Sequence, residues 1–292
     1  MGAAATGTYI YMFCALVSEI WKNKIPGLDV TVMATSGSTA NYLPMERQEM
    51  ELGGASQAGD YYAMNGMYFT KEKLTGFSVL FPAAVAFTHT LTYADSPIKT
   101  WKDLEGKRVG ISTRAAPTSI ISEETFKALG IKPKPVFATP NETIEMFKDR
   151  RIDAITYNAG APWSGIMDAA TNVPVKLVPL TPDEQQRVKN AMPYHIPNVL
   201  PAKTYAFQTE DVRLNTVYQH VIARGDLSAD MVYKMTKVAW ENWDQVVKGA
   251  PAAKWVSPKD ILNFVTPVHP GAAKYYREIG IQVPESNVWK KK

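Results

Sequence analysis

A short, hydroxyl-rich turn is the stretch of this sequence best suited to bind a ligand. It covers residues 35–38 (Thr-Ser-Gly-Ser), in which Gly37 tolerates positive φ and the hydroxyl groups can cap a following helix. Valine and alanine alternate with polar residues over 29–34, which predicts a strand before the turn. A helical pattern over about 38–48 follows it. Such a turn presents backbone N–H groups and the positive end of a helix dipole, so we expect it to bind a small anion.

Several other polar loops also follow predicted strands. They cover residues 7–9, 36–41, 56–57, 113–118 and 158–162. In an open parallel sheet the carboxyl ends of the strands lie along one edge, where small ligands bind. We therefore expect these loops to gather there.

Motifs for catalysis are missing from the sequence. The histidines (His89, His195, His220 and His269) are far apart, and none forms a zinc-binding helix motif. No phosphate-binding Gly-rich loop, dinucleotide fingerprint or nucleophile elbow occurs. The single cysteine, Cys14, lies among apolar residues, which favours a buried thiol. The sequence therefore favours binding over catalysis, with no cofactor and no metal.

Composition indicates a soluble, well-cored chain. Its 292 residues are 46% hydrophobic and 21% charged, and this length predicts one large domain or two of ordinary size. The net charge is +4, and the scattered lysines and arginines form no basic stripe of the kind that binds nucleic acid. The longest apolar run, around residues 79–87, is too short to span a bilayer. No signal peptide opens the chain, so composition leaves open a cytoplasmic protein or a trimmed mature form.

The pattern of elements predicts two α/β lobes. A loop over residues 2–8 precedes a helix over 9–24, which suggests a βαβ unit without its first strand. Strands are expected at 52–56, 77–82 and 85–93. A second alternating unit begins near residue 96, and its helices open with capping boxes at Thr139 and Thr181. From about Val212 the chain is expected to be mostly helical and to complete the first lobe.

The chain resembles a known family over nearly its whole length and in the family's order of motifs. The matching segments are Gly7-Thr-Tyr9, Gly37-Ser-Thr-Ala-Asn41, residues 101–109, Arg151-Ile-Asp-Ala154, Ala159-Gly-Ala-Pro162, Pro193-Tyr-His-Ile-Pro197 and residues 267–278. Each motif is weak alone, but the ordered set is specific. The family is that of the substrate-binding receptors of tripartite ATP-independent periplasmic (TRAP) transporters, of the TAXI type.

This resemblance implies a type II periplasmic binding-protein fold, in which two α/β lobes close over a ligand at a hinge. Lobe 1 would contain residues 1–88 and 208–292, and lobe 2 residues 89–207. The ligand would be a small carboxylate such as glutamate or 2-oxoglutarate. The partner would be a TRAP membrane permease driven by an ion gradient. The protein would be a periplasmic monomer whose signal peptide and first strand precede Gly2.

The resemblance also carries over ligand-binding residues. In the first lobe these are Thr8, Tyr9, Ser38, Asn41 and Gln57, and in the second they are Thr118, Asn158 and Gly160. One motif departs from the family, which usually has Gly-Ser-Gly-Thr where this chain has Ala-Ala-Pro-Thr over residues 115–118. Pro117 removes one N–H donor from that anion cradle. We expect Arg114 to replace the lost attraction as a charge-assisted partner of the ligand.

Two other interpretations are compatible with the same fold. The protein could be a sensory or orphan receptor that passes its ligand to a signalling partner. An enzyme on the same scaffold would need a reactive side chain in the cleft, and Cys14 and His89 are the candidates.

Overall fold

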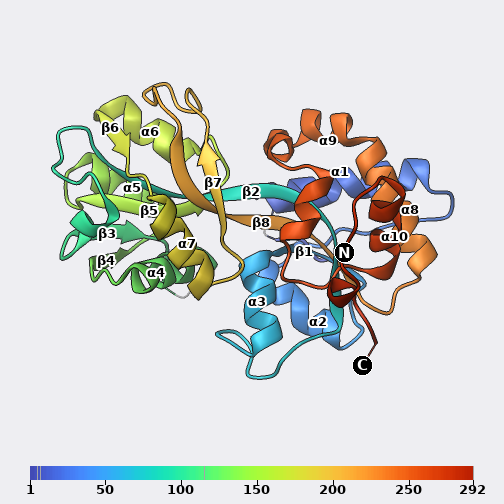
Figure 1. Ribbon diagram of the computed structural model, residues 1–292. Coiled ribbons are helices and arrows are strands. Elements are labelled where there is room, and N and C mark those ends of the chain that lie inside the picture. Colours follow the sequence, from blue (N-terminus) through green and yellow to red (C-terminus); the bar gives the residue numbers. More distant parts are fainter. Residues whose placement is uncertain (5, 7, 115, 292) are drawn as a thin grey trace. The chain divides into compact units, whose positions relative to one another are not determined.

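The computed structural model describes residues 1–4, 6, 8–114 and 116–291 (Figure 1). The chain forms two compact units, which are Met1–Val85 with Tyr218–Lys292, and Ala86–Val217. We call them unit 1 and unit 2. Two long strands, β2 (Phe77–Tyr93) and β8 (Val212–Arg224), each contribute residues to both units.

The first residues of the chain form part of the unit 1 sheet, so the loop expected over residues 2–8 is wrong at its start. Gly2 makes parallel bridges to Met33 on one side and to Gly53 on the other. The N–H groups of Gly2 and Ala3 donate to the carbonyls of Leu52 and Met33, at 2.9 Å each. Residues 1–4 therefore pair between residues 29–34 and β1, through a bridge at Gly2, in the place of the first strand that the sequence pattern lacks. The 29–34 segment makes its backbone hydrogen bonds to residues 1–4 only. It therefore forms a single bridge at Met33, where a strand was expected.

Two adjacent glycines allow helices to pack on both faces of unit 1's sheet. They lie in β1 (Leu52–Ser56), where neighbouring residues face opposite sides. A Cβ on Gly54 would lie 2.7 Å from Ile10 of α1 (Tyr9–Lys24), whereas one on Gly53 would lie 3.3 Å from Asn41. The close approach of α1 thus depends on the missing side chain of Gly54. On the Gly53 face lie η1 (Ser38–Asn41) and α2 (Tyr42–Glu46), so the helix expected over 38–48 is two short pieces.

The remaining elements of unit 1 correct the expectation of a helical region from Val212. The chain there forms β8, whose residues Gln219–Ala223 pair antiparallel with β1. The apolar residues between Val232 and Val246 lie on two helices, which are separated at Asn242. The other elements of unit 1 are α3 (Gln57–Asn65), α8 (Ala229–Glu241), α9 (Trp243–Gly249), η3 (Pro251–Trp255), η4 (Pro258–Asn263), α10 (Pro270–Glu278) and η5 (Glu285–Asn287).

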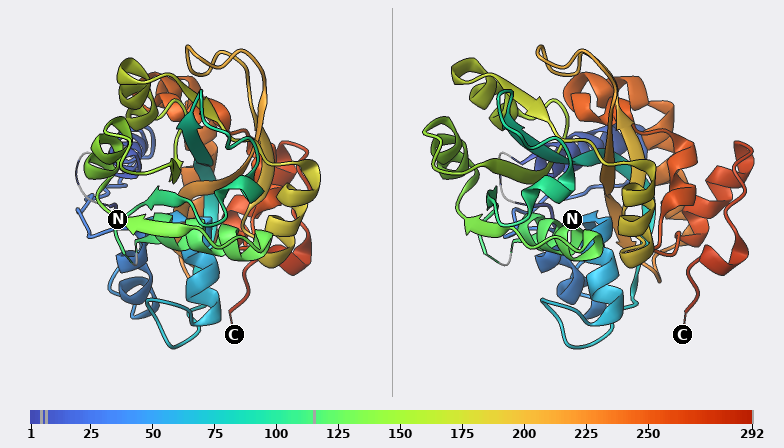
Figure 2. Two further views of the ribbon diagram at one scale, coloured as in Figure 1. Left: turned by 90° about the vertical axis from the view of Figure 1, so that its left-hand side faces the viewer. Right: turned by 60° about the vertical axis from the view of Figure 1, so that its left-hand side comes forward.

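Unit 2 contains a mixed sheet whose parallel strands lie at one end. β3 (Arg108–Ile111) pairs parallel with β4 (Lys134–Phe137) and with β5 (Ala154–Ala159), and these strands lie side by side in green in Figure 2. β5 pairs antiparallel with β2, which also pairs with β6 (Val175–Leu177). β7 (Ile196–Leu200) pairs antiparallel with β8. The strand β2 is continuous through Pro82, where the sequence suggested two strands.

Helices of unit 2 cross between its parallel strands. α4 (Pro117–Leu129) leads from β3 to β4, and α5 (Pro140–Lys148) leads back past β3 to β5. Right-handed crossovers in opposite directions place helices on opposite faces of a sheet. Accordingly α4 packs with α7 (Pro182–Ala191), and α5 packs with α6 (Ser164–Asn172). The predicted capping boxes of α5 and α7 are confirmed. A further 3-10 turn, η2 (Trp101–Leu104), precedes β3.

Besides His220, three other histidines are buried in the cores of these units. His89 and His195 belong to unit 2, and His269 caps α10 in unit 1. Burial lowers the pKa of His89 and His269 to about 4, and that of His195 to about 3. His195 is fully buried, and neither of its ring nitrogens has a hydrogen-bond partner among the described residues. All three rings are therefore neutral at pH 7.

We expect acid to destabilise the protein well above the range in which carboxylates titrate. Histidine in the unfolded chain has a pKa near 6.5. Between pH 6.5 and 4 these three histidines are therefore protonated in the unfolded state but not in the folded state. Each of the three residues should then lower the free energy of unfolding by about 1–2 kcal/mol between pH 7 and pH 5. Urea unfolding at a series of pH values measures this slope.

A variant provides the control. His195→Leu removes one buried ring, so its stability should fall less steeply with acid than that of the wild type. A wild-type free energy of unfolding that is unchanged between pH 7 and pH 5 would contradict this account.

Candidate ligand-binding site

The carboxyl edge of unit 1's sheet is where three of its helical elements begin. Residues 1–4, the 29–34 segment and β1 run parallel, so their carboxyl ends lie together. They lead into α1, η1 and α3 respectively. The structure therefore brings the predicted residues of the first lobe to one edge of unit 1. Gly7, in the first of these loops, lies outside the described residues.

Thr8 and Tyr9 lie at the start of α1. The Thr8 side chain is the N-cap and accepts a hydrogen bond from the N–H of Tyr11, with 3.4 Å between nitrogen and oxygen. The Tyr9 hydroxyl donates to the carbonyl of Ala83 at 3.0 Å. Burial raises the pKa of Tyr9, so the phenol stays protonated as a donor. Thr8 is exposed and Tyr9 is half-buried.

Ser38 is the half-buried first residue of η1. The preceding Gly37 has a φ of 150°, which confirms that this turn needs glycine. The Thr35 hydroxyl lies within hydrogen-bonding reach of the carbonyls of Ala3 and Gly37, so it ties the turn to the first strand. The turn is thus held by the Thr35 side chain, and Ser38 is placed at its end.

Asn41 is fully buried. Its amide nitrogen lies 2.8 Å from the carbonyl of Gly54, 3.2 Å from that of Gly2 and 3.3 Å from that of Ala3. One side chain therefore joins η1 to two neighbouring strands of the sheet. Binding a ligand through this nitrogen would break those contacts, so the geometry gives Asn41 a structural role in holding the edge together.

Gln57 is the first residue of α3 and is also fully buried. Its side-chain nitrogen donates to the carbonyl of Asn263 in η4 at 2.7 Å. Its amide oxygen has no partner among the described residues. The side chain thus links the N-terminus of α3 to η4 and keeps one unused acceptor.

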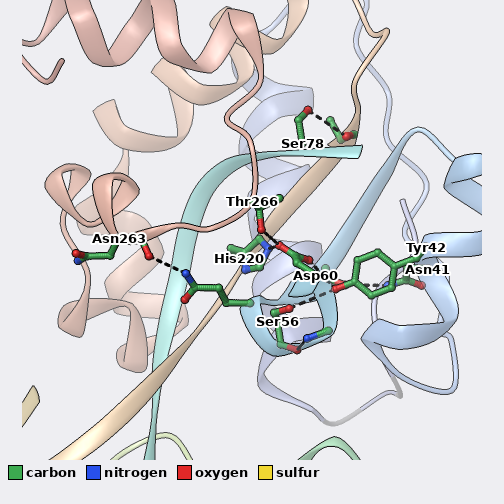
Figure 3. A network of polar contacts seen from close by, with 12 residues as sticks. Asn41, Tyr42, Ser56, Asp60, Ser78, His220, Asn263 and Thr266 are labelled. Carbon is green, nitrogen blue, oxygen red and sulfur yellow. Dashed lines mark hydrogen bonds and ion pairs between the residues drawn. The ribbon is translucent and has the colours of Figure 1, made fainter. Parts of the chain in front are cut away.

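A buried polar cluster that no sequence pattern indicates lies beneath this edge (Figure 3). The carboxylate of Asp60, in α3, accepts from the Tyr42 hydroxyl at 2.6 Å, from His220 Nε2 at 2.7 Å and from the Thr266 hydroxyl. The Asp60 and His220 side chains are both fully buried. Burial, followed by the charge of Asp60, raises the pKa of Tyr42 well above its ordinary value. The partners of Asp60 are distant in sequence, so no local spacing indicates the cluster.

At the carboxyl edge of unit 2, the turn after β3 leads into α4. Pro117 is the first helical residue, and Ala116 at the N-cap makes no side-chain capping bond within the described part of the chain. The Ser119 hydroxyl instead closes the turn, 2.9 Å from the Thr113 carbonyl and 2.8 Å from that of Ala116. Thr118 is half-buried in the first turn of the helix. Ala115 lies outside the described residues.

Arg114 lies in the same turn and is exposed. Its guanidinium carbon lies 3.9 Å from the centre of the Phe137 ring, at the carboxyl end of β4. A cation over an aromatic face at an exposed site contributes about 0.5–1 kcal/mol, enough to favour one orientation of the side chain. Among the described residues no carboxylate forms an ion pair with Arg114. The edge thus carries an oriented, uncompensated positive charge.

Asn158 and Gly160 follow at the end of β5. The Asn158 side-chain nitrogen lies 3.1 Å from the carbonyl of Ala86 and 3.2 Å from the hydroxyl of Thr88, both on β2. Because β3 and β5 are parallel, this loop and the Arg114 turn lie at the same edge of the sheet. The structure therefore also brings the four predicted residues of the second lobe to one edge of unit 2.

The side chains considered for an enzyme are held in unreactive forms. Cys14 is fully buried, and burial raises the pKa of its thiol to about 12. His89 is buried and neutral. In the described residues, no three His, Cys, Asp or Glu side chains are grouped so as to hold a metal ion.

Comparison with known families identifies the chain. Residues 1–280 match the NMT1-like family. The chain belongs to the NMT1-like family. The two units built around open sheets agree with that assignment, and the match covers elements of both.

Solved structures show which fold this NMT1-like protein has. It aligns with the periplasmic aliphatic sulphonate-binding protein SsuA from Escherichia coli over 99% of this chain and 96% of that one, with a TM-score of 0.52 and 13% identity. It aligns with MatC from Rhodopseudomonas palustris with bound malate over 96% of each chain, with a TM-score of 0.56 and 10% identity. XAC2383 from Xanthomonas citri bound to ATP aligns over 96% and 94%, with a TM-score of 0.53 and 8% identity.

These likenesses establish the fold expected from the sequence. The chain has the α/β fold of the type II periplasmic solute-binding proteins. Among the described helices, none combines the length and apolar character needed to cross a bilayer.

We expect the Asp60 cluster to dominate the stability of unit 1. Asp60→Ala removes the acceptor of three buried donors, and such a loss should lower the free energy of unfolding by about 3–5 kcal/mol. The control is Asp29→Ala, because Asp29 makes an exposed ion pair with Lys22 at 3.6 Å, and that change should cost less than about 1 kcal/mol. Urea unfolding of both variants makes the comparison, and equal losses would contradict the role of the cluster.

Proposed function

We propose that this protein is an extracytoplasmic receptor that binds a small organic carboxylate and delivers it to a membrane permease. The ligand class is that of glutamate and 2-oxoglutarate. The permease is of the TRAP type and is driven by an ion gradient, as the TAXI resemblance implies. The protein acts in the periplasm as a monomer and catalyses no reaction.

The observation that carries this proposal is the unpaired guanidinium of Arg114 at the carboxyl edge of unit 2. Phe137 orients it, and no acidic side chain of the described residues neutralises it. A guanidinium matches a carboxylate with two parallel hydrogen bonds, which favours a planar anion. Arg114 thus supplies the charge, and the donors around it select the shape of the ligand.

The first turn of α4 provides a second attraction. It starts next to Arg114, and its dipole places partial positive charge at the same edge. Pro117 contributes no N–H, so Thr118 and its hydroxyl are the nearest donors of the helix. Asn158 and Gly160 would complete the contacts from β5. In unit 1 we propose that Thr8 and Ser38 serve as neutral donors, while Tyr9, Asn41 and Gln57, whose donors are bound to backbone carbonyls, act mainly by holding that edge in place.

The neighbours in fold agree with an anionic ligand without fixing which one. Their names give an aliphatic sulphonate, malate and ATP as their ligands, and all three carry negative charge. The choice among anions must then come from side chains of this chain. A single guanidinium with neutral donors suits a small carboxylate better than a polyphosphate.

A thermal-shift screen with a panel of small acids tests the proposal. A ligand at a hundred times its Kd stabilises the folded state by about 2.7 kcal/mol, so binding raises the melting temperature. We expect glutamate, 2-oxoglutarate or a related acid to do so, with no product formed in the same tube. Chemical conversion of the acid would favour an enzyme instead, and no shift with any carboxylate would contradict the proposal.

Arg114→Ala tests the residue that carries the charge. We expect the Kd for the acid to rise at least about tenfold, because a charge-assisted hydrogen bond to the ligand is lost. The matched control is Arg151→Ala, which removes an equal charge from an exposed residue. Arg151 lies just before the first residue of β5, at the end of that strand away from Arg114. Titration calorimetry measures both. An unchanged Kd in Arg114→Ala would refute this assignment.

A further inference from the structure

The loop from Asn158 to Trp163 is held in an unusual way. It links β5 to α6, and the N-cap residue of α6, Trp163, makes no side-chain capping bond within the described part of the chain. The backbone N–H of Trp163 donates instead to the hydroxyl of Tyr205, at 2.9 Å. A residue more than forty positions away in sequence therefore fixes the end of this loop.

The indole of Trp163 is covered as well. Its ring stacks on that of Tyr157, with centroids 4.5 Å apart and an interplanar angle of 8°. A Cβ added to Gly165 would lie 2.6 Å from the indole, so that glycine leaves room for the ring. Trp163 is thus restrained by a stacking partner, by the Gly165 backbone and by the bond to Tyr205.

Tyr205 is buried, and its oxygen also lies 2.9 Å from Nε2 of His89 on β2. Because this oxygen accepts the N–H of Trp163, its own hydrogen is available for His89. A neutral His89 with its proton on Nδ1 accepts that hydrogen. Burial lowers the pKa of His89 to about 4, which agrees with a neutral ring. The Tyr205 oxygen therefore joins the Trp163 backbone to the His89 ring.

The segment that carries Tyr205 is itself rigidly held. The buried side-chain nitrogen of Gln208 lies 3.1 Å, 3.0 Å and 2.9 Å from the carbonyls of Leu200, Pro201 and Glu210. The Tyr205 ring also stacks on Phe207, with centroids 5.6 Å apart. These contacts hold the Tyr205 hydroxyl in a fixed position next to the Asn158–Trp163 loop.

We propose that Tyr205 is a positioning residue, whose hydroxyl sets the geometry of the Asn158–Trp163 loop and thereby the affinity for ligand. The inference rests on the proposed function, because Asn158 and Gly160 belong to the proposed carboxylate site. Tyr205 acts through the backbone of Trp163 and through His89, without touching the ligand itself.

Tyr205→Phe tests the inference, since it keeps the ring and its stack on Phe207 but removes the hydroxyl. We expect hydrogen exchange of the amides in residues 158–163 to accelerate about tenfold, because the loop loses the bond that closes it. For the acid found in the screen, we expect Kd to rise about fivefold, mainly through a faster off-rate.

The matched control is Tyr93→Phe. The Tyr93 hydroxyl lies 2.7 Å from the carbonyls of both Phe147 and Ile152, so it also links buried groups. These groups precede the first residue of β5, whereas the Asn158–Trp163 loop lies at the other end of that strand. This variant should lose stability while exchange of residues 158–163 and Kd stay at their wild-type values.

The outcomes separate this inference from the proposed function. Unchanged exchange of residues 158–163 in Tyr205→Phe would overturn the inference, whether or not a ligand is known. Equal rises in Kd for both variants would also overturn it, since they would reflect a general loss of stability. If the wild type binds no acid, the proposed function fails, and the exchange measurement alone decides the role of Tyr205.

Discussion

The buried carboxylate of Asp60 is the constraint on which unit 1 depends. Four segments distant in sequence supply the carboxylate and its donors, which are α2, α3, β8 and the loop at Thr266. A buried carboxylate is tolerated only when its oxygen atoms accept hydrogen bonds, so these four segments must come together in one arrangement. The start of α3 is set by the same cluster, because Tyr42 also contacts the carbonyl of Ser56, the N-cap of that helix. The Asp60 cluster therefore helps to fix the position of the carboxyl edge of unit 1's sheet.

Polar residues at the carboxyl edges of the two units divide into supports and free groups. Asn41 and Gln57 are buried, and their nitrogens are bound to backbone carbonyls. Tyr205 and His89 support unit 2 in a comparable manner. Arg114 differs, because its positive charge is oriented by an aromatic ring and is matched by no acidic side chain of the described residues. A receptor needs this combination, since rigid supports lower the entropy lost on binding and an unpaired charge attracts the ligand.

Local patterns predicted the local structure well and the long-range structure less well. The helix over Tyr9–Lys24, the capping boxes at Thr139 and Thr181, and the positive φ of Gly37 follow from neighbouring residues alone. The strand β8 was missed because it is buried on both sides and shows no simple alternation. A loop is expected over residues 2–8 because alanine and glycine carry almost no strand signal. The Asp60 cluster and the bond from Trp163 to Tyr205 join residues far apart in sequence, so no spacing could indicate them. The fold class was predictable, whereas the support of the candidate site was visible only in three dimensions.

The most direct test of the account is a crystal structure of the protein grown with the acid that stabilises it most. The account predicts electron density for a carboxylate group within hydrogen-bonding distance of the Arg114 guanidinium and the Thr118 hydroxyl. Density for the acid that contacts neither residue would contradict the account.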